Sequence, residues 1–190
     1  MSLFNSRFYD FNVHQDSNPV TELAFEAKKY GYCGIAIVNS AMTNEDKLPE
    51  DFSIYRSIEI SCKPSKLREE IKKHKGTESI LTVVGGDEEL NRAAVETEGL
   101  DILLQPAQFN NVLAKAASDN SVAIGFNLGS LIRLRGEARV RELMNMRENL
   151  KHSRKYDLQM ILTGTVRTTA PLEILRRKNP DYIQEGIEIL

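Results

Sequence analysis

The sequence predicts a single α/β domain, residues 1–190, folded as a compact TIM-like (β/α) barrel. Strand-like and helix-like segments alternate from one end of the chain to the other, which is typical of parallel strands joined by helices. Some of the strand-like runs are apolar throughout, as in strands covered on both faces. The length of 190 residues allows a sizeable core but is short for a closed eight-stranded barrel.

Strands in the first half of the chain are indicated by their period and by the turns that bound them. Residues 8–13 and 54–61 alternate apolar with polar side chains, as half-buried strands do. Residues 32–39 and 79–86 are nearly continuous apolar runs that end in turn residues. We therefore expect four strands before residue 90.

The helices between these strands show 3.6-residue spacing and recognisable ends. The helix at residues 21–30 stops at Gly31, and the helix that Pro64 opens ends at Gly76. Asp87 caps a third helix, whose first turn carries two glutamates that suit the helix dipole.

The second half continues the alternation. Strands are predicted at residues 100–106, 121–129 and 159–166, with helices at 109–117 and 137–156 between them. The side chains expected to face inward from the long helix are Val140, Leu143, Met144 and Leu150.

The tail is expected to complete the barrel. A short helix is predicted at residues 171–178, and the eighth strand would have to come from Gly186–Leu190. Closure by this last strand is the least determined part of the fold.

Composition excludes several classes of protein. No apolar stretch approaches the roughly 20 residues that a membrane helix needs, and the first residues lack a basic-then-apolar signal peptide. We therefore expect a cytoplasmic protein without membrane contact. Cys33 and Cys62 lie in strand-like runs and are expected to be buried thiols.

Charge is distributed unevenly along the chain. Residues 1–132 carry 13 Lys and Arg against 19 Asp and Glu, a balance of −6. Residues 133–178 carry 12 basic against 5 acidic side chains, a balance of +7. This separation predicts one basic face on an otherwise acidic body.

The opening stretch FYDFNVH raises the question of a metal site. Asp10, Asn12 and His14 alternate, so a regular strand would point all three to one face. The strand resembles that of the polymerase-and-histidinol-phosphatase (PHP) phosphoesterases, which have His where this chain has Asn12. The chain contains three histidines in all, too few for a cluster that activates water. We therefore predict no catalytic residues and no metal ligands.

Two other kinds of site are weighed against simpler interpretations. The stretch VVGGDEEL offers glycines before a helix N-terminus, but it lacks the lysine of a phosphate-binding loop and is better explained as a tight turn. A small-molecule barrel enzyme would need a deep pocket lined by Asp10, His14, Asn39 and Asn127.

The basic segment LIRLRGEARVRELMNMRENLKHSRKY is the strongest functional signal. Arginine offers planar pairs of donors that suit phosphates. Any one of these cations is more often a solvated surface residue, but as a group they favour contact with an RNA backbone without base-specific reading. The predicted RNA-binding residues are Arg133, Arg135, Arg139, Arg147 and Lys151.

Several stretches, in order, resemble the archaeal ribonuclease P protein component 3 family, the counterpart of a eukaryotic thirty-kilodalton subunit. They are YDFNV, YCGIAIVN, LTVVGGDEELNRAAVETEGLDILLQP, NNVLAKAASDNSVAIGFNL and RELMNMRENLKHSRKYDLQMILTGT, between about residues 8 and 166. The block at Gly85–Leu103 is the most specific part.

The resemblance implies a PHP-related barrel without the metal site, in a non-catalytic subunit of the enzyme that removes 5′ leaders from precursor tRNA. It implies as partners the ribonuclease P RNA, protein component 2 and the other protein subunits. It also implies that the protein binds no cofactor, because the RNA subunit uses the Mg²⁺. The alternative left open is a metal-dependent PHP-type phosphoesterase with a degenerate site.

Overall fold

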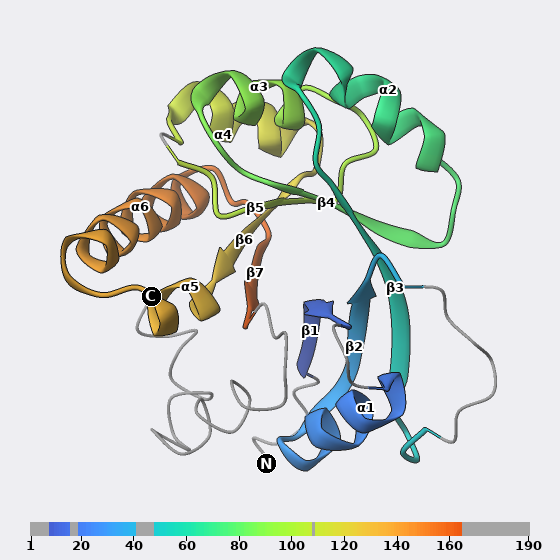
Figure 1. Cartoon of the computed structure of the whole chain (residues 1–190). Helices are drawn as coiled ribbons and strands as arrows, with labels where there is room; N and C mark the ends of the chain where they lie inside the picture. The colour runs from blue at the N-terminus through green and yellow to red at the C-terminus, as the bar shows by residue number, and fades with distance from the viewer. Residues whose placement is uncertain (1–7, 16–18, 41–47, 108, 165–190) are drawn as a thin grey trace, which may run out of the picture. The chain divides into compact units, whose positions relative to one another are not determined.

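The computed structural model describes residues 8–15, 19–40, 48–107 and 109–164 (Figure 1). By contacts within the chain it consists of two compact units. Unit 1 contains residues 1–57 and 164–189, and unit 2 contains residues 58–163 with Leu190. Each unit is described by itself below.

Unit 1 is built from parallel strands and one helix. Its elements are β1 (Phe8–His14), α1 (Val20–Lys29), β2 (Tyr32–Val38) and the first part of β3 (Ser53–Ile60). β2 pairs in parallel with both β1 and β3. α1 covers β2 with its buried residues Leu23, Ala24 and Ala27, as the helical spacing predicts.

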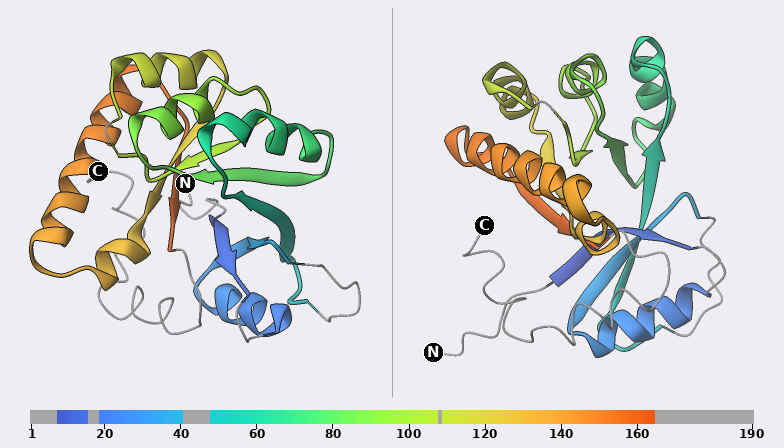
Figure 2. Two further views of the ribbon diagram at one scale, coloured as in Figure 1. Left: turned by 45° about the horizontal axis from the view of Figure 1, so that its top comes forward. Right: turned by 60° about the vertical axis from the view of Figure 1, so that its left-hand side comes forward.

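Unit 2 repeats the strand–helix alternation. After the end of β3, its elements are α2 (Pro64–His74), β4 (Ser79–Val84), α3 (Glu88–Val95), β5 (Ile102–Leu104), α4 (Asn111–Asp119), β6 (Ala123–Asn127), α5 (Leu128–Arg133), α6 (Gly136–Lys155) and β7 (Met160–Thr163). Strands β4 to β7 pair in parallel in chain order. Helices α2, α3, α4 and α6 contact one another in succession and cover the strands, as Figure 2 shows.

The seven parallel strands, hydrogen-bonded in chain order from β1 to β7, confirm the predicted α/β, TIM-like fold class. The predicted helix at residues 171–178 and the eighth strand at Gly186–Leu190 lie outside the described residues. Among the helices that the structure describes, none is both long enough and apolar enough to cross a bilayer. Cys33 and Cys62 are free thiols and only partly buried.

The helix α5 was not predicted and shortens a predicted strand. The apolar run at residues 121–129 was expected to remain a strand to its end, but β6 stops at Asn127. The Asn127 side chain accepts the backbone N–H of Ser130 at 3.2 Å and so caps the first turn of α5. A local capping bond therefore overrides the apolar pattern at this point.

The orientation of α6 also differs from the prediction. Val140, Leu143 and Met144 were expected to face inward, but they are 57%, 47% and 64% exposed. The buried side chains of α6 are instead Met146, Asn149 and Ser153, with Leu150 partly buried beside the core. Asn149 explains the difference, because its Nδ2 donates to the Pro106 carbonyl oxygen at 2.8 Å and so satisfies its polar group inside unit 2.

Candidate nucleic-acid interface

The basic segment lies on α5, on α6 and on the short link between them. All five predicted RNA-binding residues, Arg133, Arg135, Arg139, Arg147 and Lys151, are exposed. The structure therefore places them where a large partner can reach them. It brings them together on two consecutive helices that contact each other within unit 2.

The two helices are joined by side-chain hydrogen bonds. The Ser130 hydroxyl donates to the Glu142 carboxylate at 2.9 Å and connects α5 to α6. Arg135 donates from Nη1 to the carbonyl oxygens of Ile132 and Leu134 at 2.6 and 2.9 Å, which caps the end of α5. These bonds hold together the two helices that carry the basic residues.

The five cations differ in how far they are already paired. Lys151 Nζ lies 3.5 Å from the Glu148 carboxylate in an exposed i,i+3 pair. One guanidinium nitrogen of Arg135 is already hydrogen-bonded to carbonyl oxygens at the end of α5. The side chains of Arg133, Arg139 and Arg147 make no hydrogen bond or ion pair with any residue of the described ranges. Because their guanidinium groups are exposed and unengaged there, these three are the residues best able to bind phosphate.

A β-bulge divides the opening strand and separates Asp10 from His14. Asp10 pairs with Ile35 and Val13 pairs with Ile37, so three steps along β1 match two along β2. Asp10 and Val13 therefore share the face of Ile35 and Ile37, which packs against α1. His14 pairs with Val38 on the opposite face. The predicted common face of Asp10, Asn12 and His14 is wrong.

The Asp10 carboxylate is buried and serves the backbone. It accepts the N–H of Asn12 and the N–H of Gly164, each at 3.0 Å. These bonds satisfy a buried charge and hold the bulge in place. Across the described ranges, no three His, Cys, Asp or Glu side chains come together as a group that could hold a metal. Asp10 and His14 therefore do not converge from one face of β1, as two ligands of one metal ion would have to.

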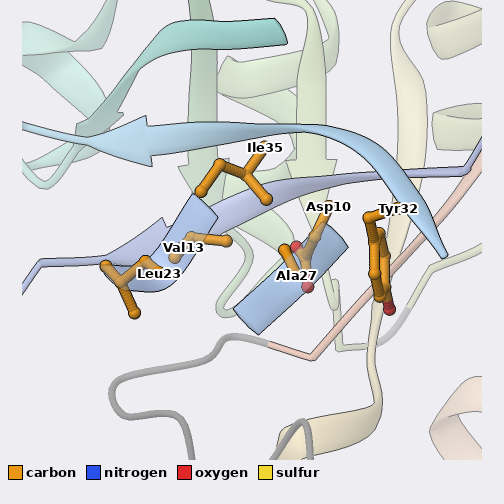
Figure 3. A pocket seen from close by; sticks show the side chains of 6 residues that line it. All are labelled: Asp10, Val13, Leu23, Ala27, Tyr32 and Ile35. Carbon is orange, nitrogen blue, oxygen red and sulfur yellow. The ribbon is translucent and has the colours of Figure 1, made fainter. Parts of the chain in front are cut away.

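Unit 1 contains a pocket beneath α1, shown in Figure 3. Of the four residues that a small-molecule enzyme would need, Asp10 alone lines this pocket. The other side chains in its wall are Val13, Leu23, Ala27, Tyr32 and Ile35. A binding site needs several polar groups that converge on a ligand, and this wall has two.

Tyr32 gives the pocket a testable pH dependence. Burial raises the pKa of its phenol well above the ordinary value of about 10, and the negative charge of Asp10 raises it further. The unfolded chain therefore loses this proton at a lower pH than the folded chain. The contribution of the Tyr32 phenol to the free energy of unfolding is present in full below about pH 10 and decreases as the pH rises above it.

We expect Tyr32→Phe to remove that loss. Between pH 9 and pH 11, the free energy of unfolding of the unsubstituted protein should fall by about 1 kcal/mol more than that of the variant. Urea unfolding at both pH values measures the difference, and the other tyrosines cancel because both proteins contain them. Parallel curves for the two proteins would show that Tyr32 does not titrate differently on folding.

The turn in VVGGDEEL is filled by the chain itself. The Gly86 N–H donates to Asn91 Oδ1 at 3.0 Å, and the Leu90 N–H donates to the Asp87 side chain at 2.9 Å. Gly85 is required because a Cβ there would lie 2.5 Å from Pro106 Cα. The N–H groups of Gly86 and Leu90 are therefore committed to side chains of the same turn, which agrees with the interpretation as a tight turn.

Comparison with protein families identifies the chain. The family model for RNase P subunit p30 matches residues 7–183. The chain belongs to this family. Ribonuclease P protein component 3 of Methanococcoides burtonii is 36% identical over 96% of this chain and 93% of its own length. The same component of Methanosarcina mazei is 35% identical over 96% and 95%. The predicted resemblance is confirmed.

The fold of this p30-family chain is found in solved structures. A chain in the cryo-EM structure of archaeal ribonuclease P with mature tRNA has a TM-score of 0.67 and 24% sequence identity, over 94% of this chain and 87% of that one. An Aspergillus niger ochratoxinase matches with a TM-score of 0.59 and 9% identity, over 90% and 66%. These likenesses support the α/β fold.

Proposed function

We propose that this p30-family protein is a non-catalytic subunit of ribonuclease P that supports the RNA subunit in removing 5′ leaders from precursor tRNA. Family membership supports the place in the enzyme. The single observation that supports the mechanism is the exposed, unengaged set of arginines on α5 and α6. The RNA subunit, other protein subunits and precursor tRNA are the proposed partners, and Mg²⁺ is proposed to act on the RNA alone.

The proposed mechanism is electrostatic. Folding brings RNA phosphates close together, and their repulsion must be screened by ions or by cationic side chains. Arg133, Arg135, Arg139, Arg147 and Lys151 supply fixed positive charge on a rigid support. The RNA then needs less Mg²⁺ to reach its active structure. Because no aromatic stacking platform accompanies these residues in the described ranges, the contact is with the backbone and not with particular bases.

The double variant Arg133→Ala/Arg147→Ala tests this mechanism. If each residue neutralises one phosphate, the slope of log K against log salt for binding to ribonuclease P RNA should become shallower by about two. The Mg²⁺ concentration for half-maximal cleavage by the reconstituted enzyme should rise. Filter binding over a salt series and a Mg²⁺ titration measure both quantities.

A matched control removes the same charge from another surface. Arg68 on α2 and Arg92 on α3 are exposed arginines, so Arg68→Ala/Arg92→Ala changes the net charge equally. This control should leave the slope and the Mg²⁺ requirement unchanged. Equal effects of the two double variants would mean that RNA senses net charge alone, and the proposed interface would be rejected.

A further inference from the structure

Helix α6 presents an apolar cluster to solvent. Val140, Leu143 and Met144 are spaced i, i+3 and i+4, which places them side by side on one face of the helix. They are among the most exposed large apolar side chains of the described residues. We call these three residues the α6 cluster.

The rotation of α6 that exposes the cluster is fixed from the opposite face. Met146 is buried in the core of unit 2, and Asn149 is tied to the Pro106 carbonyl oxygen. Turning the cluster inward would break this bond and expose Met146. The exposure is therefore a consequence of tight packing and not of a loose helix.

Clustering separates these residues from ordinary exposed apolar side chains. Phe25 on α1 and Val112 on α4 are 49% and 61% exposed, and each is the only large exposed apolar residue on its helix among the described residues. Single exposed apolar residues are normal, whereas a contiguous group on a helix face marks an interaction site. Val140, Leu143 and Met144 form such a group.

The charges beside the cluster indicate what covers it. Arg139 and Arg141 lie about 100° on either side of Val140 around the helix, so they border the α6 cluster on both flanks. Neither guanidinium group makes a hydrogen bond or an ion pair within the part of the chain that the structure describes. Arginines outnumber carboxylates on this face, where Glu137 lies between Met144 and Arg141, so a second copy would bring mainly like charges together, which disfavours self-association.

We propose that the α6 cluster docks a segment of another protein subunit of the ribonucleoprotein, with apolar side chains at its centre and carboxylates at its rim. The inference rests on the proposed function, because it takes the partner from the same complex. RNA phosphates cannot bury leucine and methionine, whereas apolar side chains of a protein can. Carboxylates at the rim pair with Arg139 and Arg141.

This assignment refines the RNA interface. Arg139 moves from the predicted RNA-binding set to the rim of the protein contact. Arg133, Arg135, Arg147 and Lys151 remain directed to RNA. RNA and a protein subunit would then meet along the exposed side of α5 and α6, with the cluster in the first half of α6 and Arg147 and Lys151 in the second.

A photo-crosslinker at position 144 tests the proposal in the assembled complex. Met144→benzoylphenylalanine is incorporated into the ribonucleoprotein reconstituted from purified RNA and protein subunits, then irradiated. We expect a protein–protein adduct whose crosslinked peptide contains Asp or Glu, resistant to ribonuclease. Val112→benzoylphenylalanine, equally exposed on α4, should give no such adduct. An adduct with RNA, or none at position 144, would overturn the proposal.

A binding measurement adds a second, independent readout. The binding partner in this measurement is the purified subunit that forms the adduct with position 144. Its affinity for this protein should fall at least about tenfold in each of two double variants, Leu143→Ser/Met144→Ser and Arg139→Glu/Arg141→Glu. The matched control Phe25→Ser/Val112→Ser should bind as tightly as the unsubstituted protein. Equal losses with the control would refute docking at the cluster.

The two proposals fail in different ways. If the chain does not enter the complex with RNA and the other subunits, the proposed function is wrong. If it enters and the Arg133→Ala/Arg147→Ala variant shows the shallower salt slope, but position 144 crosslinks to RNA or to nothing, only the docking inference is wrong.

Discussion

Replacing Asn91 with alanine is expected to lower the free energy of unfolding by about 3 kcal/mol. The Asn91 side chain is completely buried and makes three hydrogen bonds to the backbone. Its Oδ1 accepts the Gly86 N–H at 3.0 Å, and its Nδ2 donates to the carbonyl oxygens of Gly86 at 3.0 Å and Ala107. Alanine would leave these part-buried backbone groups without their protein partner, and an uncompensated group costs about 1–3 kcal/mol.

Asn91 connects two loops that follow neighbouring strands. Gly86 lies between β4 and α3, and Ala107 lies between β5 and α4. One amide therefore holds together the ends of two strands in unit 2. Asn149 reaches the same β5–α4 loop at Pro106, so loss of Asn91 should also loosen the support of α6.

Chemical denaturation with two companion variants isolates the role of Asn91. Asn120→Ala also removes an amide that donates to two carbonyl oxygens, those of Val95 and Ala116, but Asn120 is exposed and water can replace it. Its cost should stay below about 1 kcal/mol. Asn91→Asp keeps the acceptor and loses both donors, so its cost should also be large. If Asn91→Ala lowers the free energy of unfolding no more than Asn120→Ala does, the hydrogen bonds of Asn91 contribute little to stability.

Replacing Gly34 with alanine is expected to cost about 2–3 kcal/mol. A Cβ at position 34 would lie 2.6 Å from the Ser53 carbonyl oxygen and 2.9 Å from the ring of Tyr9. The ring could move, but the carbonyl belongs to β3, which pairs with β2 at this residue. Relief of the clash would therefore have to separate two paired strands.

Gly86→Ala provides the control for backbone effects of losing a glycine. A Cβ there would meet only the flexible side chain of Leu90, at 3.1 Å. Its cost in urea unfolding should be below about 1 kcal/mol. If Gly34→Ala proves as mild as Gly86→Ala, the strands of unit 1 have more freedom at this point than the structure indicates.

The geometry of the opening strand does not suit a metal cluster of the kind expected for PHP phosphoesterases. A metal cluster requires ligands that converge from one face, and the bulge in β1 places Asp10 and His14 on opposite faces. Asp10 is also committed to the backbone N–H groups of Asn12 and Gly164. Introducing histidine at position 12 would therefore not by itself create a metal site in this strand.

Much of the fold was open to prediction from local sequence. The seven described strands and the helices α1 to α4 and α6 follow from period, from Pro64 and Asp87 at helix starts, and from Gly31 and Gly76 after helix ends. These signals depend on residues only a few positions apart, so they do not depend on how the rest of the chain packs. The basic segment and the family resemblance were likewise readable without coordinates.

Two features were decided by contacts between distant parts of the chain. The rotation of α6 depends on a bond from Asn149 to Pro106, 43 residues away in sequence. The helical pattern alone could not choose a face, because apolar residues occupy more than one side of α6 and the side chains that face inward include Asn149 and Ser153. The bulge in β1 depends on pairing with β2 and on the Asp10 carboxylate.

The sequence by itself determined the described elements other than α5, their order, the excess of cations after residue 132 and the family. The tertiary structure decided which side of each element faces a partner, and so exposed the α6 cluster and divided the polar residues of β1. The physical reason is that period and caps are properties of neighbouring residues, whereas the orientation of an element is set by the hydrogen bonds and packing it makes with the rest of the unit.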